Sequence, residues 1–155
     1  GYVYPAVDVH WQFLAHMVEE HGVEVTAPLY PLAPEASATE AVHWAMNFYR
    51  EFTAHHAGPF IMAGDSAGGG LCAAVLQQAR GDGLILPNAL ILVCPWLDLS
   101  VSHPDQMAIE PLDCVLTING ARAAGRLYAR ELPLDDPKVS PLFGNWGGCP
   151  PILLF

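Results

Sequence analysis

The sequence runs Phe60-Ile61-Met62-Ala63-Gly64-Asp65-Ser66-Ala67-Gly68, and a helix-like apolar run from Gly70 to Arg80 follows it. The short apolar run predicts a buried strand, and the glycines after it predict a tight turn into the helix. A serine at the point of such a turn stands on strained backbone, so the residues two before and two after it must be very small. Gly64 and Gly68 meet that demand, and the pentapeptide is typical of a nucleophile elbow.

An elbow of this kind would place the reactive serine hydroxyl at the N-terminus of the helix. Backbone N–H groups there point toward a site where negative charge develops in acyl transfer, and Ala67 N–H is the expected oxyanion donor beside Ser66. We expect Asp65 to have a structural or supporting part next to the nucleophile. The competing interpretation is a glycine-rich turn that binds nothing.

The same stretch also looks like the Gly-Asp-Ser-Gly-Gly serine segment of chymotrypsin-like proteases. Those proteases are antiparallel β-barrels whose histidine lies far upstream of the serine. Here His55 stands only eleven residues before Ser66, at the end of a strong helical pattern. The architecture therefore argues against a protease of that class.

Length and composition predict one domain with a substantial core, because 52% of the 155 residues are hydrophobic. Sixteen acidic residues against six basic ones give a formal charge of −10, so no basic stripe is available to bind nucleic acid. The four cysteines lie far apart, which predicts free thiols in a reducing compartment.

No apolar stretch is long enough to span a bilayer, and we expect a cytoplasmic protein. Histidine spacing indicates no metal site, and the sequence does not predict the oligomeric state.

Helical and strand patterns alternate along the chain, which predicts an α/β fold. The apolar runs are continuous rather than alternating, as in a doubly wound, mostly parallel sheet with helices on both faces. The first helix has an apolar stripe of Trp11, Leu14, Ala15 and Val18. Strands are predicted at Val23 to Ala27, Phe60 to Ala63, Ala89 to Cys94 and Pro151 to Phe155, and helices at 8–21, from Ser37 to about Ala57, at 70–80 and from Thr117 to about Glu131.

Four segments together resemble the α/β-hydrolase superfamily, and within it the hormone-sensitive-lipase-like carboxylesterases and lipases, bacterial family IV. They are the elbow, the loop Tyr30-Pro31-Leu32-Ala33-Pro34-Glu35, the segment Cys94-Pro95-Trp96-Leu97-Asp98-Leu99-Ser100, and Asp136-Pro137 with Ser140-Pro141-Leu142-Phe143. The resemblance covers residues 1–155. Pro31 departs from the family, which usually has an arginine there that would tie the loop down.

The resemblance implies that Ser66 attacks an ester carbonyl, that a histidine takes its proton, and that an acid orients the histidine. In this family the acid and the histidine follow the serine in chain order, and their expected positions lie beyond Phe155. His103 is expected to be a surface loop residue. Gly1 would be the last glycine of the family's His-Gly-Gly-Gly oxyanion loop.

We therefore expect residues 1–155 to be a partial α/β-hydrolase catalytic domain, incomplete at both ends, with part of the cap at about 102–131. The implied function is hydrolysis of a small-molecule carboxylic ester through an acyl-enzyme, without metal or cofactor, and residues 1–155 alone should be inactive. In such a sheet the third strand lies between the fourth, Val23 to Ala27, and the fifth, Phe60 to Ala63, so a gap is expected beside them. Two alternatives stay open: a non-catalytic receptor on the same fold, as in gibberellin receptors, and a scaffold with no function of its own.

Overall fold

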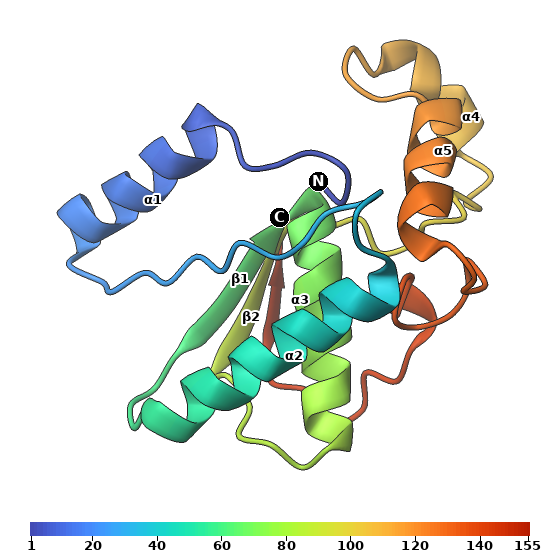
Figure 1. The fold of residues 1–155 in the computed structure, drawn as a ribbon. Helices are drawn as coiled ribbons and strands as arrows, with labels where there is room; N and C mark the ends of the chain where they lie inside the picture. Colours follow the sequence, from blue (N-terminus) through green and yellow to red (C-terminus); the bar gives the residue numbers. More distant parts are fainter.

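The structure is a computed structural model that describes residues 1–155. Figure 1 shows a small parallel sheet with two long helices in front of it and a first helix that stands apart. The elements in chain order are α1 (Asp8–His21), α2 (Ala38–His55), β1 (Ile61–Asp65), α3 (Ser66–Gly81), β2 (Ala89–Val93), α4 (Gln106–Ile109), the 3-10 turn η1 (Glu110–Leu112), α5 (Ile118–Ala129), the 3-10 turn η2 (Pro141–Phe143) and β3 (Ile152–Leu154).

The sheet has three strands in the order β1-β2-β3, and both pairs are parallel. Residues that pair in register point to the same side of the sheet. On one side Leu90 and Leu92 are buried against Leu76 of α3. On the other side Ile61 is 60% exposed and Val93 is 43% exposed, so within residues 1–155 that face carries apolar side chains without a cover.

Helices α2 and α3 lie over the covered face (Figure 1). The stripe predicted for α2 is its buried side, because Val42, Met46 and Tyr49 belong to the main hydrophobic core. The predicted capping box also forms: Ser37 Oγ accepts from the backbone N–H of Glu40 at 3.4 Å, and the Glu40 carboxylate accepts from Ser37 N–H at 2.7 Å. The parallel sheet and its helices confirm the predicted α/β fold class. The helices expected on both faces are found on one face only within residues 1–155, since Ile61 and Val93 on the other face are exposed.

One prediction about the first third of the chain is wrong, because Val23 to Ala27 is not a strand. The outer edge of β1 stays unpaired, which agrees with the gap expected beside these two segments. The helix predicted at 8–21 is α1, and no residue of α1 is buried. A pattern reports which side of an element is apolar and not whether a neighbour covers it.

The predicted cap region contains α4, η1 and α5. Thr117 caps α5 by accepting a hydrogen bond from Gly120 N–H at 3.0 Å, as predicted, while α4 and η1 have too few residues to give a periodic signal. Arg130 ends α5 with a φ of 50° and donates a hydrogen bond to the carbonyl of Pro34. An arginine thus holds the Tyr30–Glu35 loop from α5, although Pro31 occupies the position of the family's usual arginine. None of the helices has the length and apolarity needed to cross a membrane.

Candidate active site

Ser66 lies where β1 ends and α3 begins, and its φ of 50° places it in the left-handed region. A residue with a Cβ costs about 1–3 kcal/mol in such a conformation. The strain turns the chain sharply from strand to helix and leaves Ser66 exposed at the turn. This is the strand-turn-helix context that the pentapeptide predicted.

The turn closes tightly because the backbone of Gly64 touches the backbone of the first turn of α3. A Cβ on Gly64 would stand 2.5 Å from the carbonyl carbon and oxygen of Gly68. A Cβ on Gly68 would meet no atom within 4 Å, so the steric reason inferred for Gly68 from the sequence does not apply. The tight contacts fall instead on Gly64 and on Gly69, where a Cβ would stand 2.9 Å from Cβ of Pro95.

Ala67 follows Ser66 as the second residue of α3 and is only 1% exposed. Its N–H is one of the first four of the helix, which have no acceptor within the helix. The helix dipole places partial positive charge at this end. The backbone around Ser66 and Ala67 can therefore stabilise a developing oxyanion.

The loop after β2 holds the elbow from the other side. Trp96 N–H donates to the carbonyl of Ser66 at 2.8 Å, and a Cβ on Gly70 would stand 2.4 Å from the carbonyl oxygen of Trp96. The Tyr2 ring packs against Trp96 at a centroid distance of 5.7 Å and stacks on Tyr128 of α5 at 3.7 Å. These supporting aromatic residues were not identified from the sequence, because contacts between such distant segments leave no local pattern.

Asp98 shapes the same loop through its carboxylate. The carboxylate accepts hydrogen bonds from the backbone N–H of Ser100 at 2.8 Å and of Ser102 at 2.9 Å, and from both hydroxyl groups. Burial works to raise the pKa of Asp98, but these hydrogen bonds together hold it below the usual range of an aspartate. These hydrogen bonds hold the backbone of the loop in place, which accounts for the Asp98-Leu99-Ser100 motif.

Several titratable groups surround Asp65, the residue before Ser66. His10 Nε2 on α1 lies 3.4 Å from Asp65 Oδ2. Burial raises the pKa of Cys72 to about 12, with Asp65 adding to the shift. Burial also raises the pKa of Tyr30 to about 12, with contributions from Cys72 and Asp65. Both groups stay neutral near pH 7, and His10 is the basic side chain that contacts the carboxylate.

Gly1, the second predicted oxyanion donor, lies in the same neighbourhood. Its amine donates to the carbonyl of Tyr4 at 2.9 Å, and its carbonyl accepts from Tyr30 Oη at 3.3 Å. Gly1 thus lies near the Ser66 end of β1, close to Asp65.

Ser66 Oγ has no hydrogen bond to a basic side chain within residues 1–155. His103 lies in an exposed loop 3.9 Å from Asp105. Two surface hollows, of about 470 and 290 Å³, are lined by other residues, the larger by Glu24, Thr26, Phe48, Glu51, Phe52, His55 and His56. No group of three or more His, Cys, Asp and Glu side chains is arranged to hold a metal ion.

Comparisons with known proteins agree with this geometry. Residues 1–155 match, along their whole length, the family described as alpha/beta hydrolase fold. An esterase of Acinetobacter venetianus is 28% identical over 152 residues, which are 96% of this chain and 50% of the relative. An acetyl-hydrolase of Streptomyces hygroscopicus is 32% identical over 86% of this chain and 45% of its own.

A solved esterase of the bacterial hormone-sensitive lipase family superposes with a TM-score of 0.92 at 30% identity, covering 99% of this chain and 52% of that chain. The chain thus spans about half the length of the relatives that it matches. The resemblance given by the four sequence segments is confirmed. The chain belongs to the α/β-hydrolase fold family and is related there to the esterases and lipases of the hormone-sensitive-lipase group.

Proposed function

We propose that Ser66 is the nucleophile of a carboxylic ester hydrolase and that residues 1–155 form part of its catalytic domain. The observation that carries the proposal is the strained backbone of Ser66, whose φ of 50° occurs at a strand-to-helix turn closed by Gly64. Strain at such a turn is costly and persists where the surrounding structure enforces it. Relatives named esterase, acetyl-hydrolase and lipase favour ester hydrolysis over other chemistry of this fold.

In the proposed reaction, Ser66 Oγ attacks the carbonyl carbon of the ester while its proton passes to a histidine base. The carbonyl oxygen becomes an oxyanion that accepts from Ala67 N–H. Gly1 N–H would be the second donor once it exchanges its bond to the carbonyl of Tyr4 for one to the oxyanion. The tetrahedral intermediate collapses, the alcohol leaves with the proton, and the acyl group stays on Ser66. Water, deprotonated by the same histidine, then releases the carboxylic acid and restores the serine.

The base and its orienting acid are proposed to come from sequence outside residues 1–155. Neither His103 nor His10 forms a hydrogen bond with Ser66. A serine without an adjacent base is a weak nucleophile near pH 7. We therefore propose that residues 1–155 alone do not turn over an ester.

The substrate is proposed to be a small or medium acyl ester. The acetyl-hydrolase relative is the reason to begin with acetyl esters. Residues 102–131, with α4, η1 and α5, are proposed to form part of the cap over the acyl group. Tyr128 of α5 stacks on Tyr2 beside the elbow, and this contact joins residues 102–131 to the site.

Hydrolysis of p-nitrophenyl acetate tests the proposal. The polypeptide encoded by the complete reading frame should hydrolyse the ester with multiple turnovers, and Ser66→Ala should remove at least about three orders of magnitude of kcat. Residues 1–155 alone should match the Ser66→Ala background. Turnover by residues 1–155 near that of an intact esterase would sink the claim that the base lies elsewhere, and a full polypeptide without turnover would favour a receptor.

A further inference from the structure

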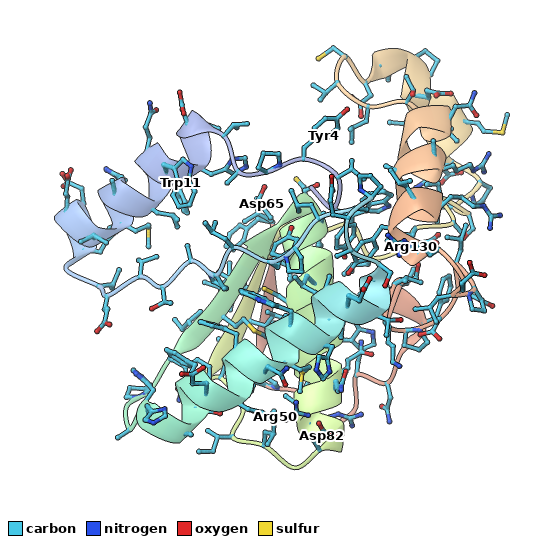
Figure 2. The ribbon with its side chains drawn as sticks, viewed as in Figure 1. Tyr4, Trp11, Arg50, Asp65, Asp82 and Arg130 are labelled. Carbon is cyan, nitrogen blue, oxygen red and sulfur yellow. The ribbon has the colours of Figure 1, made fainter.

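Helix α1 has one ion pair with the rest of the chain, and that pair ends at the elbow. No residue of α1 is buried, and Figure 1 shows the helix apart from the sheet. His10 in its first turn places Nε2 3.4 Å from Oδ2 of Asp65. In Figure 2 Asp65 lies at the end of β1, and Trp11, the neighbour of His10, lies on α1.

The ring of His10 is held by the backbone that begins α1. Val7 N–H donates to His10 Nδ1 at 3.0 Å, and Val7 carbonyl oxygen lies 3.3 Å from the same nitrogen. When the ring is neutral, Nδ1 accepts from Val7 N–H and the proton resides on Nε2. When the ring is protonated, Nδ1–H can donate to the Val7 carbonyl. In both states Nε2–H faces Asp65.

Asp65 has no other side-chain partner. Its carboxylate does not cap α3, of which it is the N-cap residue. It is joined by one peptide bond to Ser66, and a negative charge one residue from the nucleophile disfavours an oxyanion there. A cation on the carboxylate would reduce that electrostatic cost.

We propose that His10 is a positioning residue for Ser66: by pairing with Asp65 it fixes the first turn of α1 against the elbow and offsets the carboxylate charge beside the oxyanion site. The proposal rests on the proposed esterase function. The remaining titratable side chains around Asp65 do not take this part near pH 7, because burial keeps Tyr30 and Cys72 neutral there.

Hydrogen exchange of the polypeptide from the complete reading frame tests the pairing without any need for activity. His10→Ala and Asp65→Asn should each speed amide exchange in the first turns of α1 by about two- to five-fold, the range of a partly exposed ion pair. The side chains are 40% and 58% exposed, which is why a larger factor is not expected. The double variant should equal either single variant, because both remove the same contact.

His16 provides the matched control. It lies on the same helix, and the one contact found for its ring is an edge contact with His21. His16→Ala should leave exchange in the first turns unchanged. His10→Arg, which keeps a cation facing Asp65, should restore the protection. Equal exchange in His10→Ala and His16→Ala would overturn the pairing.

The positioning claim requires a kinetic measurement on the full polypeptide. His10→Ala should lower kcat for p-nitrophenyl acetate by about two- to five-fold with little change in KM, and the loss should vanish in an Asp65→Asn background. An unchanged kcat together with faster exchange would reduce His10 to a purely structural contact and overturn the claim. Absence of any Ser66-dependent turnover would instead count against the proposed function, and the exchange data would still decide the pairing.

Discussion

Gly64 and Gly68 stand at equal distances in sequence on either side of Ser66, yet the structure makes them unequal. A Cβ at Gly64 would lie 2.5 Å from backbone atoms of Gly68, whereas a Cβ at Gly68 would lie in open space. Gly64→Ala should therefore lower the free energy of unfolding by about 1–3 kcal/mol through overpacking. Gly68→Ala should raise it by about 0.5–1 kcal/mol, because Gly68 is helical and alanine is the better helix former.

Urea unfolding monitored by circular dichroism measures both variants against the wild type. The two substitutions are matched, since each adds one methyl group two residues from Ser66. A similar loss of stability in both would contradict the unequal packing of Gly64 and Gly68 at the elbow.

Asp98 gives a residue-scale prediction about pH. Its pKa in the folded protein lies below the usual value, so the carboxylate network stabilises the fold above the pKa of an unfolded aspartate, about 3.9. That contribution is lost as the pH falls through the lower, folded-state pKa. In Ser100→Ala/Ser102→Ala the Asp98 carboxylate should titrate at a higher pH than in the wild type, as NMR of the carboxyl carbon would show. An unchanged pKa of Asp98 in this variant would contradict the stabilising role of these hydrogen bonds.

At the scale of elements, α1 and α2 are neighbours in sequence but differ in how the rest of the chain holds them. Helix α2 is fixed by a capping box and a buried side, whereas α1 has 14 residues and none of them is buried. Isolated helices of about 12–15 residues are marginal in water. In residues 1–155 we predict that amides of α1 exchange at least about tenfold faster than those in the middle of α2. Comparable exchange rates in the two helices would show that another part of the chain packs on α1.

The elements that local chemistry determines were predictable from the sequence. The Ser37–Glu40 box located the start of α2, Thr117 located the start of α5, and the run into Gly64 located β1 and the elbow. Val23 to Ala27 failed because a strand needs a partner that its own sequence does not encode. At the candidate site, the turn was predictable from its glycines, but the support of Tyr2, Trp96 and Tyr128 was not, since tertiary packing alone brings them together.

At the scale of the whole molecule, the exposed surface is too large for a closed domain. The accessible surface is 9380 Å², whereas a folded protein of 16.7 kDa is expected to expose about 7,600 Å². The difference, about 1,800 Å², exceeds the roughly 800 Å² that one partner buries in a standard interface. Ile61 and Val93 on the uncovered face and the free edge of β1 contribute to it.

We predict that residues 1–155 alone self-associate, because an unpaired strand edge beside apolar side chains is a template for association. Light scattering after size exclusion, over about a tenfold range of concentration, should show a mass that rises above 16.7 kDa. Ile61→Lys on the free edge should reduce the association. Glu51→Lys on α2, away from the sheet, should not. A monomer at all concentrations that melts cooperatively would contradict the open edge.

The central claim is that Ser66 is the nucleophile and that its base lies outside residues 1–155. Diethyl p-nitrophenyl phosphate, which phosphorylates activated serines, tests both parts when the modified residue is located by mass spectrometry. We predict one diethylphosphoryl adduct, on Ser66, in the polypeptide from the complete reading frame, and none in Ser66→Ala or in residues 1–155 alone. An adduct on another residue, or rapid labelling of Ser66 in residues 1–155 alone, would contradict the claim.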